Sequence, residues 1–204
     1  MTTPQDLLIV ALDVPSSRPV GQGDLSLALA GAELLDLLDA QAVTLEDDRL
    51  VPSAERVTGD RLLDRAGAQL LRQAPYETVE DWLWRRGRGL AAAYADAMKE
   101  EERGGGKSRH WLPRRGDRTA PADTPARRHA RDRWASHEPV LVALAAALGI
   151  QDSPPAERTA HAATGEDRVE TVLAAVGDAL TELEAVRQRR RIEDDAFDNV
   201  WRAP

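Results

Sequence analysis

The sequence predicts a mostly α-helical single domain with one or two small β-hairpins. Its 204 residues and mass of 22.3 kDa suit one domain. Hydrophobic residues make up 42% of the chain, enough to build a core, while aromatic residues make up only 4%. Leucine and alanine recur at helical spacing along most of the chain, and both residues favour helices over strands.

Two helices are expected at the start of the chain. Residues 5–13 form a short apolar run, which predicts a buried helix with Thr3 as a candidate N-cap. The stretch 14–23 contains two prolines and several other turn residues, so it is expected to be a loop. Asp24 can cap the next helix, in which the leucines between residues 25 and 38 surround most of the axis. That helix is therefore expected to be central and largely buried.

A small β-hairpin is expected next, with strands over 42–45 and 49–51 and an end at Pro52. Its turn, Glu46-Asp47-Asp48, is interpreted as solvated rather than as a metal site. A further helix is expected to open at residues 58–60 and to stop at Pro75. The pattern thus places the hairpin between two helices.

The region from Thr78 to residue 150 is expected to complete the helical domain. A helix begins at the candidate N-cap Thr78, contains Trp82 as a structural residue and ends at the triglycine 104–106, with Gly87 and Gly89 weakening its middle. An irregular hairpin or long loop then follows at about 107–123. Two more helices are expected over 125–135 and 138–148.

The last part of the chain is expected to be a linker over 151–164 and then, over 165–204, an amphipathic helix and tail that pack on the same domain. Apolar residues from Val169 to Val186 lie on one helical face. The basic run 187–191 is expected at the C-terminus of this helix, where cations complement the helix dipole. Phe197, Val200 and Trp201 are expected to dock the tail.

Charge is divided along the chain, although the formal net charge is −8. Residues 85–135 hold 14 Lys and Arg against 7 Asp and Glu, whereas acidic residues dominate on both sides of this block. Such a block predicts an electropositive face that attracts the phosphates of lipid or nucleic acid. The alternative is that its arginines pair with acidic residues elsewhere in the chain.

Several classes of protein are excluded or disfavoured. The chain has no cysteine, which excludes disulfide scaffolds and thiolate zinc sites and suits a reducing compartment. No apolar run approaches the roughly 18–20 residues of a membrane span. The first residues carry no basic region typical of a secretory signal, so a cytoplasmic protein is expected.

No motif gives an argument for catalysis. Residues 105–108, Gly-Gly-Lys-Ser, are similar to the end of a phosphate-binding loop, but Glu101 stands where that motif needs a glycine. The four histidines lack metal-ligand spacing, and no Gly-x-Ser-x-Gly nucleophile turn is present. We therefore predict no catalytic residue, no metal and no cofactor, and do not expect an enzyme.

The basic stretch contains one apolar pair, Trp111 and Leu112, flanked by Arg109, Arg114 and Arg115. An exposed apolar tip with basic flanks is typical of an interfacial membrane anchor, because the tip enters the headgroup region while the cations contact anionic lipid. The alternative is that Trp111 packs on the core.

Two strings are specific enough to indicate a family, and both lie in the first half of the chain. They are Thr58-Gly59-Asp60-x-Leu62-Leu63-Asp64 and Glu77-Thr78-Val79-x-x-Trp82. Together with the segments 7–13 and 25–45, they resemble, in order and spacing, the Golgi phosphoprotein family, which binds phosphatidylinositol 4-phosphate and has many actinobacterial relatives. The resemblance covers roughly residues 5–150.

The resemblance implies a basic headgroup pocket beside a hydrophobic hairpin that touches the membrane. The family's headgroup tryptophan falls on the stretch 20–23, which has no aromatic residue, and a second-helix arginine falls on Ala30. Of two arginines after the Trp82 helix start, one is kept as Arg88 and the other is Ala91, with Arg85 as a nearby substitute. The hairpin counterpart, 107–123, contributes Arg109, Trp111, Leu112, Arg114, Arg115 and Arg118.

The first functional hypothesis is therefore a peripheral membrane protein at the cytoplasmic face of a membrane, of Golgi type if the source is eukaryotic. It would bind anionic lipid, including phosphatidylinositol 4-phosphate, through the basic pocket and hairpin tip. The alternative is a soluble adaptor, with protein partners, that has lost specific lipid binding. Nucleic acid is not expected as a partner, because the aromatic residues interleaved with the arginines of the basic block are limited to Trp111 and Trp134.

Overall fold

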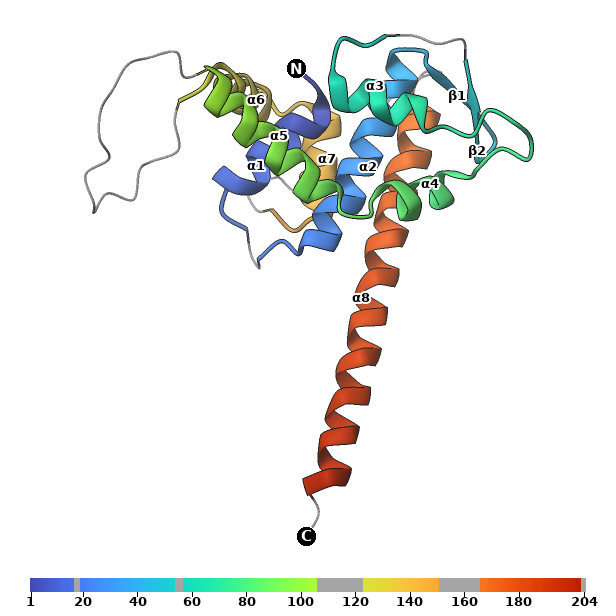
Figure 1. The fold of residues 1–204 in the computed structure, drawn as a ribbon, viewed down its shortest axis with the longest axis vertical. Helices are drawn as coiled ribbons and strands as arrows, with labels where there is room; N and C mark the ends of the chain where they lie inside the picture. Colours follow the sequence, from blue (N-terminus) through green and yellow to red (C-terminus); the bar gives the residue numbers. More distant parts are fainter. Residues whose placement is uncertain (17–18, 54–56, 106–122, 151–165, 203–204) are drawn as a thin grey trace.

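The structure is a computed structural model that describes residues 1–16, 19–53, 57–105, 123–150 and 166–202 (Figure 1). These ranges form eight helices and one antiparallel two-stranded hairpin, which confirms the mostly helical single domain. The expected second hairpin at 107–123 lies almost wholly outside the described residues. The elements are α1 Thr3–Asp13, α2 Gln22–Asp39, β1 Val43–Glu46, β2 Arg49–Pro52, α3 Arg61–Ala68, α4 Val79–Arg86, α5 Leu90–Gly105, α6 Pro125–Ala135, α7 Pro139–Ala147 and α8 Glu166–Arg202.

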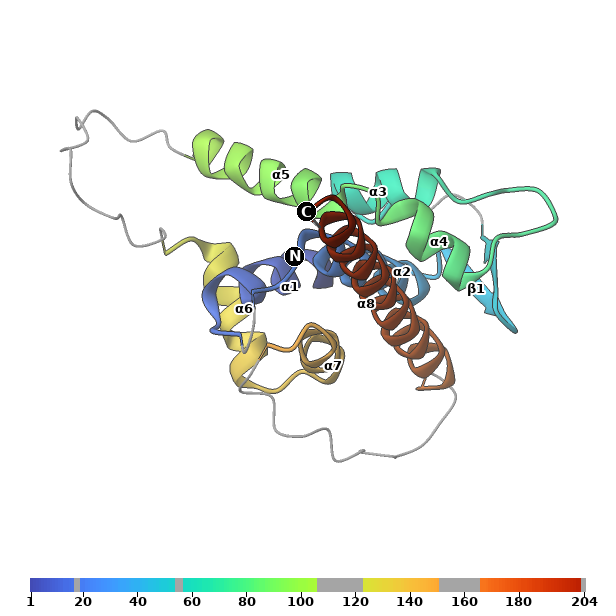
Figure 2. The same ribbon diagram turned by 90° about the horizontal axis from the view of Figure 1, so that it is seen from below.

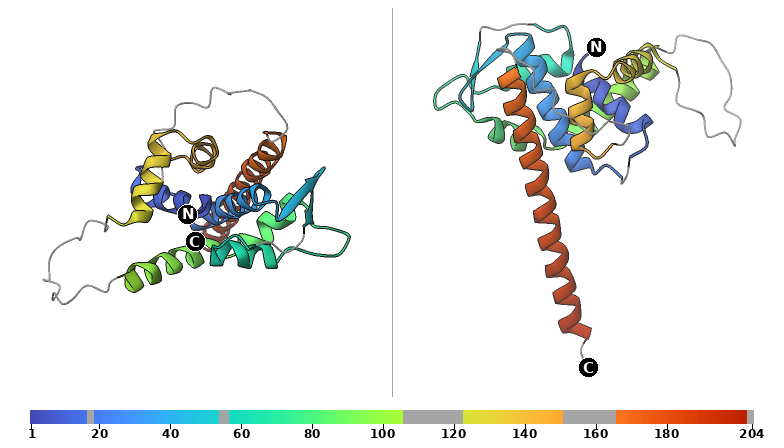
Figure 3. Two further views of the ribbon diagram at one scale, coloured as in Figure 1. Left: turned by 90° about the horizontal axis from the view of Figure 1, so that it is seen from above. Right: turned by 180° about the vertical axis from the view of Figure 1, so that it is seen from behind.

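Helix α2 is the centre of the domain, as expected from its leucines. It contacts α1, α3, α4, α5, α7 and α8, which surround it in Figure 3. Small residues let its neighbours come close: Ala28, Ala30 and Ala32 are all fully buried. A Cβ on Gly31 would lie only 2.4 Å from Val176 Cγ2 of α8, so only glycine permits this approach.

The expected helix from Thr78 to the triglycine is in fact two helices. Thr78 is the N-cap of α4 and forms a capping box with Asp81, which confirms that start. The helix ends at Arg86, and α5 begins at Leu90 after a turn in which Gly89 adopts a φ of +70° (Figure 2). This positive φ is readily adopted by glycine and interrupts the helix.

Trp82 is structural, as predicted. Its side chain is fully buried in the core, and its indole Nε1 donates a hydrogen bond to the Ala30 carbonyl at 3.0 Å. The indole therefore joins α4 to α2 by both packing and hydrogen bonding.

Helix α1 begins differently from the expectation. Its N-cap is Thr2 rather than Thr3, and the Thr2 side chain makes no capping hydrogen bond. Instead, the Thr3 backbone N–H donates to Asp36 Oδ2 of α2 at 2.8 Å. A neighbouring helix thus satisfies a free N–H at the helix start.

Helix α6 lies against α1 (Figure 2), and charged side chains make several of the contacts between the two helices. Arg127 forms an ion pair with Asp13, and Arg133 Nη1 lies 2.7 Å from Asp6 Oδ2. His129 Nδ1 lies 3.2 Å from the other Asp6 oxygen, and Asp6 itself is fully buried. We call these contacts the α1–α6 seam.

Helix α8 has an inner part and a projecting part. Val172, Val176 and Ala179 of the inner part are buried against the body. The helix then continues to Arg202, and its ribbon runs clear of the body in Figures 1 and 3. The prediction that the basic run 187–191 ends the helix is therefore wrong. Residues 187–202 contain neither glycine nor proline, so nothing local stops the helix there.

Candidate functional site

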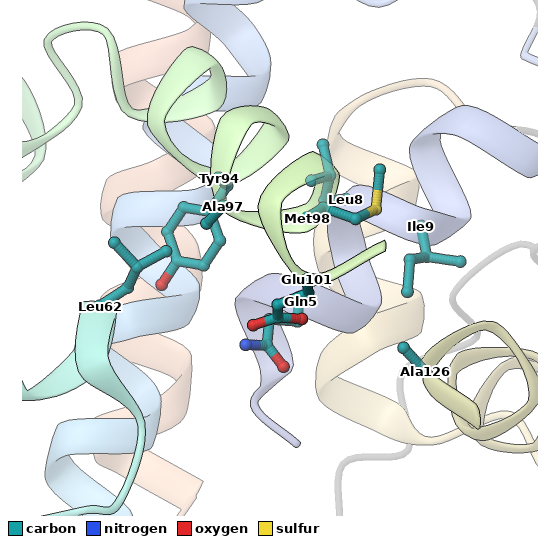
Figure 4. Close-up of a pocket in the computed structure, with 9 residues that line it drawn as sticks. All are labelled: Gln5, Leu8, Ile9, Leu62, Tyr94, Ala97, Met98, Glu101 and Ala126. Atoms are coloured by element: carbon teal, nitrogen blue, oxygen red, sulfur yellow. The ribbon is translucent and has the colours of Figure 1, made fainter. Parts of the chain in front are cut away.

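One small crevice lies between α1, α3, α5 and α6 (Figure 4). Apolar side chains such as Leu8, Ile9, Leu62 and Met98 line it, and its volume is only about 20 Å³. That volume is close to the minimum for a single water molecule. The crevice is therefore a packing gap and carries no binding chemistry.

A larger polar cavity of about 380 Å³ lies where α1, α2, α6, α7 and α8 meet. It mixes the carboxylates of Asp36, Asp39 and Glu138 with Arg133 and Arg168. Arg133 is engaged by Asp6 and by Glu138, the latter at 2.9 Å, so its charge is already neutralised. In the described ranges, no group of histidine and acidic side chains is placed to hold a metal ion.

A third cleft, of about 280 Å³, opens at the start of α2, and we call it the α2 cleft. The first turn of α2 forms one wall, the α4–α5 turn forms another, and Leu183 of α8 closes the side. Its lining residues are Gln22, Gly23, Ser26, Leu27, Trp84, Gly87, Arg88, Gly89 and Leu183. The cleft therefore brings together three segments that are far apart in the sequence.

The α4–α5 turn is held against α2 by specific contacts. A Cβ on Gly87 would lie 2.6 Å from the Leu83 carbonyl oxygen and 3.3 Å from Leu27 Cδ2, so the turn needs glycine there. The Ala91 backbone N–H donates to Ser26 Oγ at 3.0 Å, which satisfies a free N–H at the start of α5. These contacts fix the backbone on both sides of Arg88.

Arg88 is the predicted site residue that the structure places in the α2 cleft. Its side chain is exposed and makes no ion pair with any described residue. The half-buried indole of Trp84 forms the adjacent wall. An uncommitted guanidinium beside an aromatic wall can receive a phosphate or carboxylate group.

Arg85, the other predicted pocket residue on this segment, is engaged elsewhere. Its guanidinium lies 2.7 Å from Glu77 Oε1 and 2.8 Å from Glu77 Oε2, and its centre is 5.3 Å from the centroid of the Trp82 ring. Glu77 is buried, so Arg85 neutralises a carboxylate that has little access to water. Arg85 is not among the described residues that line the α2 cleft.

Arg86 has a similar internal role. Its Nε and Nη2 each lie 2.7 Å from an oxygen of Glu33, and the Tyr94 hydroxyl donates to the same carboxylate at 2.9 Å. Glu33 is fully buried. Burial raises the pKa of Glu33 above its ordinary value, while Arg86 and the Tyr94 hydrogen bond oppose this rise. Arg86 thus connects α4 to α2 just before the turn that carries Arg88.

The remaining predicted site residues lie outside the described ranges: Arg109, Trp111, Leu112, Arg114, Arg115 and Arg118. Their assignment to a lipid-binding tip stays a prediction. Ala30, at the family's arginine position, is fully buried and faces the core. Of the site residues predicted from the sequence, Arg88 is therefore the one that lines the α2 cleft in the described part of the chain.

Sequence reasoning missed two walls of the cleft. Trp84 was not among the residues that the sequence singled out, and Leu183 was predicted only as part of the apolar face of the last helix. No local signal marks either residue, because the cleft forms only when α4 and α8 pack on the same end of α2.

A family model described as Golgi phosphoprotein 3 (GPP34) matches residues 4–191. The matched range includes the α2 cleft, both specific strings and the basic run of α8. Searches of curated proteins and of solved structures give no match.

Proposed function

The chain belongs to the Golgi phosphoprotein 3 (GPP34) family, a non-enzymatic family of lipid-binding and adaptor proteins, and from this premise we propose that it is a peripheral membrane protein. It binds anionic lipid, including phosphatidylinositol 4-phosphate, at the α2 cleft. No described helix is long and apolar enough to cross a bilayer. The contact that we assign to the membrane is with the lipid headgroup.

The observation that carries this proposal is the position of Arg88. It stands uncommitted at the mouth of a cleft of about 280 Å³, while its neighbours Arg85 and Arg86 are both paired with buried carboxylates. A phosphate can therefore engage Arg88 without breaking an ion pair inside the protein. A charge-assisted hydrogen bond of this kind contributes about 1.5–3 kcal/mol.

Vesicle flotation tests this proposal. Wild-type protein is expected to float with phosphatidylcholine vesicles that contain phosphatidylinositol 4-phosphate or phosphatidylglycerol, and not with phosphatidylcholine alone. Arg88→Gln is expected to weaken binding about ten-fold or more, from the loss of one charge-assisted contact. Arg128→Gln is the control, because Arg128 is an exposed arginine on α6, already paired with Asp123 at 3.1 Å. Equal binding by wild type and Arg88→Gln would reject Arg88 as a contact.

The predicted tip at Trp111 and Leu112 is a second part of the proposal, and it has its own test. Trp111→Ala is expected to weaken flotation at every salt concentration, because insertion of the indole is hydrophobic. Replacing Arg114 and Arg115 together by alanine is expected mainly to flatten the salt dependence. Unchanged flotation of Trp111→Ala would remove the tip from the proposal.

A soluble adaptor remains the second candidate, favoured by one observation. The α2 cleft holds a single uncommitted arginine, whereas a doubly charged phosphate is usually held by several charge-assisted bonds. Failure of the wild-type protein to float with any anionic vesicle would reject lipid binding and leave the adaptor.

A further inference from the structure

A second cleft lies beside the first, against the start of the projecting part of α8. Its volume is about 490 Å³, and we call it the α8 cleft. The α2 cleft uses Gln22, Gly23 and Leu183, and the α8 cleft continues from there with Gly21 and Glu184. Its lining residues are Pro19, Gly21, Asp24, Glu184, Arg187, Arg190 and Arg191. The two clefts therefore adjoin along the same helix.

Three arginines define the chemistry of the α8 cleft. Arg187, Arg190 and Arg191 are spaced by three and one residues, so they share one face of α8, and that face meets the loop before α2. Gly21 and Gly23 lie against Arg187, since a Cβ at either position would lie 3.1 Å from Arg187 Nη2. The cleft is thus formed by a close fit between α8 and the start of α2.

Two of the three arginines are fixed by carboxylates. Arg187 Nη1 lies 2.7 Å from Asp24 Oδ1 and 2.8 Å from Asp24 Oδ2. Arg191 Nη2 lies 2.9 Å from Glu184 Oε1. These pairs hold two guanidinium groups in the cleft wall and consume its two negative charges.

Arg190, the third arginine of the cleft, is not fixed by a carboxylate in the part of the chain that the structure describes. It is exposed, it lines the cleft, and it forms no ion pair with any described residue. Three cations against two carboxylates leave the cleft with a positive charge, which is carried by a side chain that can reorient. Each of the two adjoining clefts therefore presents one uncommitted guanidinium, Arg88 in the first and Arg190 in the second.

We propose that the α8 cleft is a second contact for the phosphates of an anionic lipid surface, with Arg190 as the residue that binds them. This inference rests on the proposed function, because it assigns a second attachment point to the same membrane. A bilayer presents many headgroups side by side and can occupy both clefts at once, whereas one small anion fills only one.

Neighbouring arginines provide a matched test of this assignment. Arg190→Gln removes the uncommitted cation from the cleft, and Arg189→Gln removes the same charge from the next residue of the same helix, which does not line the cleft. Binding is measured on phosphatidylcholine vesicles containing phosphatidylglycerol at low salt. Arg190→Gln is expected to weaken partition about five-fold, and Arg189→Gln less than two-fold. Both residues are exposed, so circular dichroism should show unchanged helix content.

The outcomes separate this inference from the proposed function. Equal losses for Arg190→Gln and Arg189→Gln would overturn the inference, because only the overall charge of α8 would then matter. Weakened binding by Arg88→Gln with full binding by Arg190→Gln would overturn the α8 cleft and leave the α2 cleft in place. In a protein that carries both Arg88→Gln and Arg190→Gln, a loss of vesicle binding equal to the product of the two single losses would support two separate contacts. Absence of wild-type binding to every anionic vesicle would overturn both.

Discussion

The inner part of helix α8 packs on α2 through small and apolar side chains, whereas the contact between α6 and α1 includes several ion pairs. At the first contact, Gly31 faces Val176 so closely that a Cβ would lie 2.4 Å from its methyl group. At the second, Asp6 is fully buried between Arg133 and His129. The first contact depends on volume, since close-packed interiors respond to a single methyl group. The second includes charged pairs, so added salt should act on it first.

The largest effect is expected on the apolar side. Trp82→Ala removes an indole that is fully buried between α4 and α2, together with its hydrogen bond to Ala30. Substitutions of this kind cost about 3–5 kcal/mol in the free energy of unfolding. Urea denaturation measures the loss. Trp84→Ala is the comparison, since its half-buried indole should cost less. A Trp82→Ala protein as stable as wild type would contradict the structural role of this residue.

Two glycines on facing helices sharpen the argument about volume. Gly31→Ala should destabilise by about 1–3 kcal/mol, because its Cβ would overlap Val176. Gly177→Ala, on α8, should instead stabilise by about 0.5–1 kcal/mol, because a Cβ there meets nothing within 4 Å and alanine is the better helix former. Thermal or urea unfolding of both proteins gives the comparison. If the two substitutions changed the free energy of unfolding in the same direction, the argument about volume would be wrong.

The charged seam is tested by Arg133→Met. This change leaves Asp6 buried with His129 as its remaining partner and should cost about 1–2 kcal/mol, allowing for the partial exposure of Arg133. Arg128→Met, which removes only an exposed pair with Asp123, should cost less than about 0.5 kcal/mol.

Salt gives the same comparison without a mutation. Added salt should speed hydrogen exchange at the amides of α6 in the wild-type protein before it affects those of α2. Equal responses of the two helices would show that the α1–α6 seam does not depend on its ion pairs.

The smallest effect is expected from Asp36, which accepts the Thr3 N–H at the start of α1. Burial raises the pKa of this carboxyl above its ordinary value of 3.8, against the opposing effect of its hydrogen bonds with Thr3. Just above pH 3.8, the folded protein therefore keeps a proton that the unfolded chain has released, and stability falls as pH rises through this interval.

Asp36→Asn should remove that fall while keeping an acceptor for Thr3. The difference between the urea-unfolding free energies of the two proteins, followed from acid to neutral pH, isolates this group from Glu33, whose pKa is raised in the same direction. If the difference in unfolding free energy between wild type and Asp36→Asn did not change with pH, the raised pKa of Asp36 would be contradicted.

Local signals were enough to predict much of the fold. The hairpin turn, the capped start of α4, the start of α6 at Pro125 and the apolar run of α7 are each encoded within a few residues, and all are present in the structure. The break between α4 and α5 was indicated only in part, by Gly87 and Gly89, because the apolar spacing of Trp82, Leu83, Leu90 and Tyr94 suits one continuous helix. The break depends on Gly87 packing against Leu27 and on the Ser26 bond to Ala91, which are contacts across the fold.

The candidate site was predicted less completely for the same reason. The resemblance selected Arg88, but the walls of its cleft come from α2, α4 and α8. Arg85 was chosen for its charge and position, whereas its ion pair with Glu77 forms only when the buried start of α4 is assembled. The alternative that arginines of the basic block pair with the chain's own acids applies to Arg85, Arg86, Arg127 and Arg133.

The projecting part of α8 gives the molecule an elongated outline (Figure 1). At 1.5 Å per residue, the 37 residues of α8 extend about 55 Å. A particle with such an arm meets more friction than a sphere of 22.3 kDa, so it sediments more slowly and elutes earlier from a gel-filtration column than its mass suggests. Its tumbling is also anisotropic: rotation about the axis of α8 is faster than rotation end over end, and amide relaxation rates therefore differ between helices that lie along that axis and helices that cross it.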